Sequence, residues 1–449
     1  MKHFDVVVVG GGPGGIAAAL AAARIGAKTL LVEKYGFLGG MSTAALVYPW
    51  MTHHDRHGNQ VIQGIPQEIV SRLVEIGASP GHLRDTIGFT SYLTPYDQEA
   101  YKSLALQMME EDGVELLFHS LLAGVKTGGR AVESINIQSE YGGERQITGN
   151  YFVDGTGSAM LVDLAGGRTY IGREEDRATQ PMSQTFRLGR VELEKVKDYM
   201  KTNPHEFHHT SLIEELDRIP LSGVCGFYSI WEQYGPVDIP RNLVLFFPGV
   251  HPGEVFINTG RIIQKDPTKV EDVTEAEKIA RKQTQDLVRF LREHIPGFAN
   301  AYLIQTGPQI GIRESRRIVG HHLLTVDDIG RGRRFPSVIA RNGYPIDIHD
   351  PTGKGIISSE STQEAYDIPY ESLVSVDLDN VLLAGRAISC DVQTFASLRT
   401  TPTCMAIGQS AGAAAALGVK QDIAAINLRV SEIQQALLQQ KAELGLEGA

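Results

Sequence analysis

The sequence has few cysteines, and their placement excludes several kinds of site. Three occur in 449 residues, at Cys225, Cys390 and Cys404, and none belongs to a C-x-x-C pair. An odd number of widely separated thiols indicates a protein without structural disulfides, and it leaves iron–sulfur clusters and four-thiolate zinc sites without ligands. We therefore expect a protein of a reducing compartment, the cytoplasm, that binds no metal.

Long apolar runs and basic stretches are also missing. No run reaches the ~18 to 20 apolar residues that a membrane helix needs, and the net charge of −11 is spread along the chain without a basic stripe. Proteins that bind a phosphate backbone concentrate Lys and Arg on one face. We expect neither a membrane nor a nucleic acid as a partner, but a small-molecule substrate; the oligomeric state stays open.

What the chain does have is 48 glycines and an alternating β/α pattern. The apolar, β-branched residues 4–9 predict a buried parallel strand, the alanine-rich stretch 13–28 predicts a helix, and residues 29–33 predict the next strand. Further segments predict a helix, a strand and two strands of a meander, at 97–113, 114–118, 131–137 and 146–153. This pattern predicts an α/β fold.

The character of the chain changes near residue 166 and returns near residue 376. The intervening part has short strands, charged loops, many prolines and one clear helix at 274–294. A strand at 380–384 and a small-residue helix at 403–417 then resume the earlier character. We predict two domains, a discontinuous nucleotide-binding domain and a mixed α+β substrate or cap domain, with the boundaries 1–165 plus 376–449 and 166–375.

A glycine fingerprint follows the first predicted strand. The segment VVVVGGGPGG places Gly10, Gly12 and Gly15 in G-x-G-x-x-G spacing, with Pro13 and Gly14 at the mouth of the predicted helix. The first glycine permits the tight turn, the second lets a pyrophosphate approach the backbone, and the third allows close contact between helix and strand. Helix-terminal N–H groups would then face the phosphates.

Glu33 ends the second predicted strand. A carboxylate at this position can accept hydrogen bonds from both ribose hydroxyls of a dinucleotide, and it would repel a 2′-phosphate. The pattern therefore predicts a dinucleotide site in which Glu33 is a ligand. Both FAD and NAD satisfy it.

Three later blocks favour FAD. The segments LLVEKYGFLGGMST, YFVDGTGSAMLVDLAGG and NVLLAGRAISC with RTTPTCMAIGQSAGAAAAL resemble the FAD-dependent oxidoreductase family whose FAD-binding domain is of the glutathione-reductase type. This group includes proteins named xanthan lyases, and it is distantly similar to fumarate reductase flavoproteins. The resemblance implies a Rossmann-like FAD-binding domain with an inserted mixed α+β substrate or cap domain, and FAD as the cofactor.

The resemblance also implies a set of cofactor-binding positions. Residues of the first of these blocks would line the pyrophosphate and flavin, Val125 would meet the adenine through its backbone, and Gly155 with Asp163 would close the dinucleotide cleft. Gly385 and Arg386 would contact the ribityl and phosphate portion. The remaining predicted contacts are Lys34, Gly39, Gly40, Met41 and Ser42, and Thr403, Cys404 and Met405 at the start of the C-terminal helix.

That C-terminal helix supports the same conclusion on electrostatic grounds. It follows Pro402, so its first N–H groups and its positive dipole end would stabilise negative charge close to its N-terminus. Reduced flavin carries such charge at N1 and at the oxygen on C2. An ordinary packed helix of small residues is the alternative explanation of this segment.

Two motifs of related flavoenzymes are missing. No cysteine pair follows Gly39-Gly40, and no second G-x-G-x-x-G follows a strand and opens a helix. A pyridine-nucleotide disulfide reductase would need both. Electrons must therefore come from a bound substrate, a transient donor or an electron-acceptor partner protein.

Candidate catalytic residues lie in the segment QIGIRESRRIVGHH, which matches a pattern GxRExRRIxG of the related family. Arg313, Glu314 and Arg316 could orient an anionic or polyhydroxylated substrate beside the flavin; the alternative is a set of structural ion pairs between domains. His322 is a weaker candidate for proton transfer. Where related sequences carry a histidine before Arg399, this chain has Val392, so proton transfer from that loop is in doubt.

Two histidine-rich segments stand outside these blocks. MTHHDRHGN and NPHEFHHT, which contains His205, His208 and His209, lack the fixed spacing of metal ligands. His53 or His54 could instead reach the substrate side of the flavin.

The predicted function is transfer of a hydride between flavin N5 and a small anionic or hydroxylated organic substrate. Reduction of an unsaturated acid, as in fumarate reductases, and service as an electron-transfer subunit of a larger complex are the alternatives.

Overall fold

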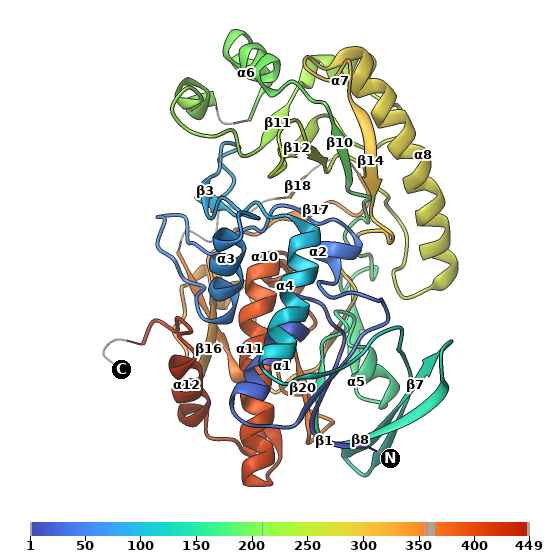
Figure 1. Ribbon diagram of the computed structural model, residues 1–449, viewed down its shortest axis with the longest axis vertical. Helices are drawn as coiled ribbons and strands as arrows, with labels where there is room; N and C mark the ends of the chain where they lie inside the picture. Colours follow the sequence, from blue (N-terminus) through green and yellow to red (C-terminus); the bar gives the residue numbers. More distant parts are fainter. Residues whose placement is uncertain (1, 209, 354–355, 358–363, 447–449) are drawn as a thin grey trace.

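The largest sheet contains the elements predicted from both ends of the chain (Figure 1). In the computed structural model, which describes residues 2–208, 210–353, 356–357 and 364–446, its strand order is β5-β2-β1-β8-β7-β6, and β20 pairs with β8. The strands are β1 (His3–Val9), β2 (Thr29–Val32), β5 (Glu115–Leu117), β6 (Leu121–Gly128), β7 (Ala131–Ser139), β8 (Gly143–Asp154) and β20 (Val381–Leu383).

One long strand, β8, gives this sheet two parts. Its first half pairs with β7 in an antiparallel meander, with Ser134 opposite Thr148. Its second half is parallel to β1 on one side and to β20 on the other, with Val153 opposite both Val8 and Leu382. The parallel part, β5-β2-β1-β8-β20, is Rossmann-like, and the predicted α/β fold is confirmed at that level.

Two helices from opposite ends of the chain pack together against the parallel strands (Figure 1). They are α1 (Pro13–Arg24) and α11 (Thr401–Gln421). A Cβ at Gly408 or Gly412 would lie 2.0 Å from the carbonyl oxygen of Gly14 or Ala18, respectively. Glycine is required at both positions because the two backbones approach this closely. α11 begins two residues earlier and ends four residues later than predicted.

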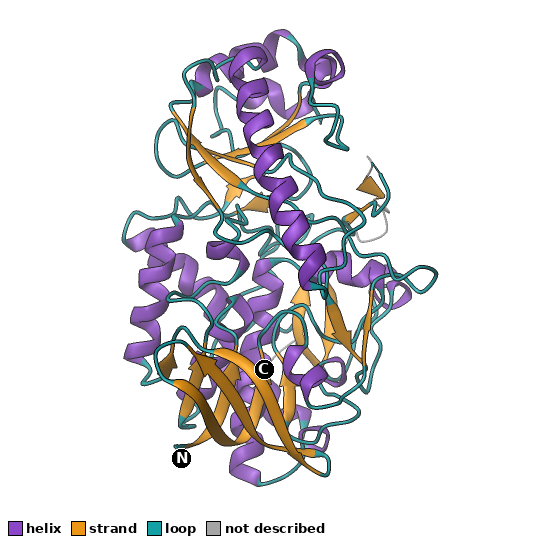
Figure 2. Ribbon diagram, turned by 90° about the vertical axis from the view of Figure 1, so that its right-hand side faces the viewer, coloured by secondary structure: helices purple, strands orange, loops and turns teal. Residues whose placement is uncertain are grey.

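The second sheet is antiparallel, with strand order β11-β12-β13-β10-β14, and it has a hydrophobic core of its own, formed by residues between Phe186 and Ala301. The long helix α8 (Val270–His294) packs on this core and extends toward the larger sheet (Figure 2). The other elements of this part are β10 (Phe186–Gly189), α6 (Leu193–Thr202), β11 (Val224–Gly226), α7 (Tyr228–Tyr234), β12 (Val244–Pro248), β13 (Val255–Ile257) and β14 (Tyr302–Thr306).

Short elements surround the larger sheet. Side chains such as Ile318, Val338 and Tyr366 share its core, so the smaller core does not extend to residue 375. The domain boundaries stay a prediction. These elements are α2 (Met41–Ala44), α3 (Ile65–Glu75), β3 (Leu83–Arg84), β4 (Tyr92–Leu93), α4 (Gln98–Glu111), α5 (Met160–Leu164), β9 (Thr169–Ile171), β15 (Arg316–Ile318), α9 (Val326–Gly330), β16 (Val338–Asn342), β17 (Ile348–His349), β18 (Ile356–Ile357), β19 (Tyr366–Pro369), α10 (Val392–Leu398) and α12 (Val430–Gln439).

Among the described residues, no helix combines the length and the apolar character that a membrane crossing requires.

Candidate functional site

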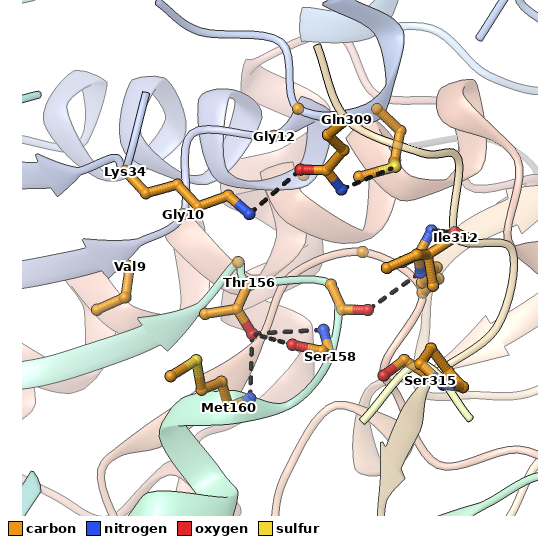
Figure 3. A pocket seen from close by; sticks show the side chains of 18 of the residues that line it. Val9, Gly10, Gly12, Lys34, Thr156, Ser158, Met160, Gln309, Ile312 and Ser315 are labelled. Carbon is orange, nitrogen blue, oxygen red and sulfur yellow. Dashed lines mark hydrogen bonds between the residues drawn. The ribbon is translucent and has the colours of Figure 1, made fainter. Parts of the chain in front are cut away.

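A cavity of about 550 Å³ lies at the carboxyl ends of the parallel strands (Figure 3). Val9 and Val32 end β1 and β2, and Gly155 and Ala384 directly follow β8 and β20; all four line the cavity. Ligands of open α/β sheets bind at this edge.

The glycine turn after β1 forms one wall. Gly10 has φ +102°, and a Cβ at Gly15 would lie 1.8 Å from the carbonyl oxygen of Gly10, so both glycines are required by the fold itself. Gly12 is different, because a Cβ there would meet no protein atom closer than 3.8 Å. Gly12 is also the N-cap of α1, and no side chain caps that helix. The first N–H groups of α1 are therefore left for a ligand.

Glu33 joins this turn to the end of β2. Its carboxylate accepts hydrogen bonds from the N–H of Gly11 at 2.6 Å and from the N–H of Tyr35 at 2.9 Å. Burial raises the pKa of Glu33, whereas these N–H groups favour the charged form. The side chain lines the cavity, where its oxygens can accept further hydrogen bonds.

Lys34 lies beside Glu33 and reaches across the cavity (Figure 3). Its Nζ donates to Oε1 of Gln309 at 3.2 Å, Tyr35 donates to the same oxygen, and Nε2 of Gln309 contacts the sulfur of Met41 at 3.8 Å. Burial lowers the pKa of Lys34. Gln309 lies in the loop after β14, in the part of the chain that carries the smaller sheet. Residues from the parts that carry the two sheets therefore both line the cavity.

The turn after β8 is held by a buried carboxylate. Asp154 accepts hydrogen bonds from the N–H and hydroxyl of Thr156, at 3.0 and 2.6 Å, and from the N–H of Leu161 at 2.9 Å. Thr156 in turn accepts from the N–H of Met160 at 3.1 Å (Figure 3). This loop is fixed in place without a ligand, so its wall of the cavity is preformed.

The start of α11, in the C-terminal part of the chain, forms another wall of the cavity. Its N-cap, Thr400, makes no side-chain cap, and Thr401 and Cys404 line the cavity. Arg386 also lines it and donates to the carbonyl oxygens of Gly157 at 3.0 Å and Ile312 at 2.8 Å. Two uncapped helix N-termini therefore meet one cavity, where both favour negative charge.

Most of the predicted cofactor positions line this cavity, and some do not. Those that line it are Gly10, Gly12, Pro13, Gly14, Glu33, Lys34, Gly40, Met41, Gly155, Gly385, Arg386 and Cys404. Those that lie outside its lining are Gly15, Gly39, Ser42, Val125, Asp163, Thr403 and Met405.

Sequence reasoning missed several lining residues. Val125 does not line the cavity. Ser120, which directly precedes β6, and Leu121 and Leu122, which begin it, do. The part of the chain that carries the smaller sheet forms a further wall of the cavity, from the start of α8 and from the loop after β14. No sequence motif marked these residues. These residues are Pro267, Thr268, Lys269, Val270, Val273, Glu277, Gln309 and Ile310.

The predicted catalytic residues lie in different surroundings. Arg313 follows Ile312, a lining residue, and donates to the carbonyl oxygen of Pro181 at 2.7 Å. Glu314 forms a buried ion pair with Arg317 at 2.5 Å. Arg316 forms an ion pair with Asp163 at 3.3 Å, and Nε2 of His322 lies 3.5 Å from Oδ2 of Asp328; neither Arg316 nor His322 lines the cavity. Their catalytic roles stay predictions.

The first histidine-rich segment forms a packed cluster with His82. The rings of His53 and His54 lie 4.8 and 4.7 Å from the ring of His82, and none of the three lines the cavity. Burial, followed by His82 and His54, holds the pKa of His53 well below its ordinary value. His209 lies outside the described residues. In the part of the chain that the structure describes, no three His, Cys, Asp or Glu side chains gather as metal ligands.

These features fit a flavin adenine dinucleotide. The open position at Gly12 and the uncapped start of α1 suit a pyrophosphate, Glu33 suits a ribose, and the start of α11 suits the negative side of a flavin ring. Nothing in the protein's own packing requires glycine at position 12.

The comparisons with known proteins agree with this fit. Dihydrolipoyl dehydrogenase of Trypanosoma brucei brucei is 49% identical over 63 residues, which are 12% of this chain and 13% of that protein. Aklavinone 12-hydroxylase DnrF of Streptomyces peucetius subsp. caesius is 29% identical over 181 residues, or 36% of this chain and 37% of that protein. The chain thus matches well under two thirds of the length of either relative.

A solved structure shares the fold. The flavin-dependent brominase Bmp2 aligns with 98% of this chain and 84% of its own, with a TM-score of 0.52 and 14% identity. The sequence profile of one family, described as FAD dependent oxidoreductase, matches residues 5–437. This protein therefore belongs to the FAD dependent oxidoreductase family, and its cofactor is FAD.

Proposed function

We propose that this enzyme transfers a hydride between N5 of FAD and a small organic substrate that is anionic or hydroxylated. One observation carries the proposal: the cavity lined by the glycine turn after β1 is also lined by Arg399, and by Ile312, the neighbour of Arg313. Guanidinium groups beside a dinucleotide site suit a substrate that bears carboxylate, phosphate or hydroxyl oxygens.

The cofactor contacts that we propose follow from the cavity. The N–H groups at the start of α1 would bind the pyrophosphate, and Glu33 would accept hydrogen bonds from the ribose hydroxyls. Leu122, which lines the cavity whereas Val125 does not, would contact the adenine. This arrangement supports an FAD-binding domain of the glutathione-reductase type. Bound FAD would supply hydride transfer at N5 of its isoalloxazine ring.

The substrate side is assigned by ion pairing. Glu314 and Arg316 already have partners within the protein, whereas Arg313 forms an ion pair with no described carboxylate. Arg313 therefore orients the substrate, together with Arg399, which lines the cavity although it is paired with Asp347. The loop that carries Gln309 and the start of α8 shield the cavity from water.

Direct redox titration tests this proposal. We expect anaerobic addition of 2-hydroxy acids such as malate or lactate to bleach the flavin band of the purified holoenzyme, and Arg313→Met to slow the bleaching. Arg289→Gln is a matched control, because the Arg289 side chain on α8 is 68% exposed. Failure of every small donor and acceptor, with a second protein co-purifying, would contradict the proposal and favour an electron-transfer subunit.

The same titration separates two other reactions. Reoxidation of pre-reduced enzyme by fumarate or crotonate, without bleaching by hydroxy acids, would favour reduction of an unsaturated acid. The likeness to aklavinone 12-hydroxylase DnrF favours hydroxylation as a second candidate. Formation of a hydroxylated product that requires O₂ would identify that reaction.

A further inference from the structure

Four arginines from separate segments gather around one aspartate next to the cofactor cavity. Nη2 of Arg399 lies 3.0 Å from Oδ2 of Asp347. Burial, followed by the positive charges of Arg399, Arg261 and Arg241, lowers the pKa of Arg313 to about 9. The four guanidinium groups are therefore close enough to repel one another.

Asp347 is engaged through one of its two oxygens, Oδ2, while Oδ1 is buried without a hydrogen-bond partner. Besides Arg399, it pairs with Nε2 of His349 at 3.2 Å and accepts a hydrogen bond from the hydroxyl of Tyr344 at 3.2 Å. Although burial favours the protonated acid, a hydrogen bond from His349 and the charges of Arg399 and Arg313 hold the pKa of Asp347 well below its usual range. Burial lowers the pKa of His349 to about 3, so the imidazole adds no charge at neutral pH.

Positive charge is in excess. Among the described residues, neither Arg241 nor Arg313 forms an ion pair; their bonds go to the carbonyl oxygens of Asn258 at 3.5 Å and Pro181 at 2.7 Å. The Nε atoms of Arg241 and Arg399 are buried without a hydrogen-bond partner. Arg261 adds a fourth guanidinium, which is bonded to His349 at 2.8 Å and to the carbonyl oxygen of Gly353 at 3.1 Å.

Such an arrangement is unfavourable in an isolated protein. Arg241 is 6% exposed, and a buried charge without a partner is strongly destabilising. Arg261 is counted separately, because the carboxylate of Asp350 also interacts with it. The other three guanidinium groups stand against the one carboxylate of Asp347, which leaves two positive charges to be balanced. A ligand with two negative charges would balance them.

The location suits a substrate of the flavin. Arg399 lines the cofactor cavity, and the lining residue Ile312 directly precedes Arg313. His349 lies on β17, which runs between the two sheets in Figure 1. Arg241 and Arg261 come from the part of the chain that carries the smaller sheet, so the cluster joins the two parts of the protein. Of the four arginines Arg399 alone lines the cofactor cavity, and Arg241 lines a second pocket beside α7.

We propose that this cluster binds a small organic dianion as the substrate, with Arg241, Arg313 and Arg399 as its direct contacts. Asp347 is a positioning residue that holds Arg399. The inference rests on the proposed function, because it names the substrate class of the same site. A dicarboxylate and a phosphorylated compound both have the required charge.

Binding of non-reacting probes to the oxidised holoenzyme tests the inference. Succinate, inorganic phosphate and acetate are titrated at pH 7 and constant ionic strength, and binding is followed by calorimetry and by the change in the flavin spectrum. We expect succinate or phosphate to bind at least roughly tenfold more tightly than acetate, because a second charge finds a second guanidinium. The tighter of the two probes identifies carboxylate or phosphate as the source of the charge.

Variants separate a ligand site from a structural cluster. Arg241→Met and Arg313→Met should weaken binding of the preferred probe roughly tenfold to a hundredfold. They should leave FAD content unchanged and the melting temperature of the ligand-free protein equal or higher, because a repulsion is removed. Arg289→Gln should alter none of these quantities.

Two results would overturn the inference. One is acetate binding as tightly as both dianions; the other is a loss of melting temperature in Arg241→Met with unchanged probe binding, as for a structural arginine. If either occurs while the flavin is still bleached by a neutral hydroxylated donor, the inference fails and the proposed function stands. If no donor or acceptor exchanges electrons with the flavin, the proposed function itself fails.

Discussion

Arg317 donates a hydrogen bond to the carboxylate of Glu314 at 2.5 Å, and the side chains are 1% and 0% exposed. The guanidinium of Arg317 also lies 4.8 Å from the ring centre of Tyr170 and 5.1 Å from that of Phe395. The second oxygen of Glu314 accepts from the N–H of Gln180 at 3.0 Å. The pair thus joins the separate segments that carry Tyr170, Gln180 and Phe395.

We expect Glu314→Gln to lower the free energy of unfolding by about 3–5 kcal/mol, because it leaves Arg317 as an unpaired buried charge. The double variant Glu314→Gln/Arg317→Met should be less destabilised than the sum of the single variants. Urea unfolding checks both expectations. A Glu314→Gln protein with unchanged stability but greatly reduced turnover would contradict them and support the catalytic role predicted from the sequence.

Because His82 is buried and its pKa is lowered, we expect the protein to lose stability in acid. Its ring nitrogens lie 2.7 Å from Oγ1 of Thr94 and 2.9 Å from Oε1 of Gln67, and burial, followed by His54, lowers its pKa from 6.5 to about 4. Between these two values the unfolded chain binds a proton that the folded protein does not. Stability therefore falls as the pH falls through this window, by up to about 1.4 kcal/mol per pH unit for this group.

Unfolding by urea at pH 7 and pH 5 measures this effect. We expect His82→Gln to lose roughly 1–2 kcal/mol less than the wild type over this interval. His57→Gln, at an exposed position, should behave like the wild type. An equal loss in wild type and His82→Gln would show that His82 is not held neutral.

We expect the stability of a variant that lacks the Asp347 carboxylate to depend on added anions. Asp347→Asn removes the one described carboxylate that pairs with the arginine cluster, and we expect a loss of about 3–5 kcal/mol. Added succinate or phosphate should restore part of this loss by binding only the folded protein. Asp238→Asn, at a side chain that is 72% exposed, is the control. Undiminished stability of Asp347→Asn in anion-free buffer would be inconsistent with an excess of buried positive charge.

Cys404 lines the cavity but is expected to be chemically inert. Its thiol donates to the carbonyl oxygen of Arg399 at 3.5 Å, and burial raises its pKa to about 12. The reactive thiolate is therefore scarce at neutral pH. We expect no alkylation of Cys404 by iodoacetamide in the folded holoenzyme, and full FAD content in Cys404→Ala. Rapid alkylation at pH 7 would contradict this assignment.

The sequence predicted those parts of the site in which chemistry and chain position coincide. Strand, glycine turn, helix and Glu33 follow one another without interruption, so local rules are sufficient to place them. The C-terminal helix was predicted from its small residues and from Pro402 at its start. Its packing against α1, through Gly408 and Gly412, was not predicted.

The remaining features of the site depend on contacts between residues far apart in the chain, which the hydrophobic periodicity of the sequence does not predict. Gln309 meets Lys34 across 275 positions of the chain, and Asp347 meets Arg399 across 52 positions. The charged segment around Arg313 was noticed, but sequence spacing could not tell that Glu314 pairs with Arg317 and that Arg313 does not. Val125 was carried over from a resemblance, whereas the lining begins with Ser120, Leu121 and Leu122, where β6 begins.

The central claim is that the cavity at the start of α1 holds the pyrophosphate of FAD, and the two glycines Gly12 and Gly15 test it together. A side chain at position 12 has space, and serine is a preferred N-cap, so the stability of Gly12→Ser apoprotein should stay within about 1 kcal/mol of the wild type. A side chain at position 15 collides with Gly10, so Gly15→Ala should lose about 1–3 kcal/mol or more.

The most direct measurement is titration of apoprotein with FAD, followed by quenching of flavin fluorescence. The account predicts one FAD per chain in the wild type and, in a stably folded Gly12→Ser protein, affinity lower by roughly tenfold to a hundredfold, since the serine occupies helix N–H groups that the pyrophosphate would use. Unchanged FAD affinity in Gly12→Ser, or a folded wild-type protein that takes up no FAD, would contradict it.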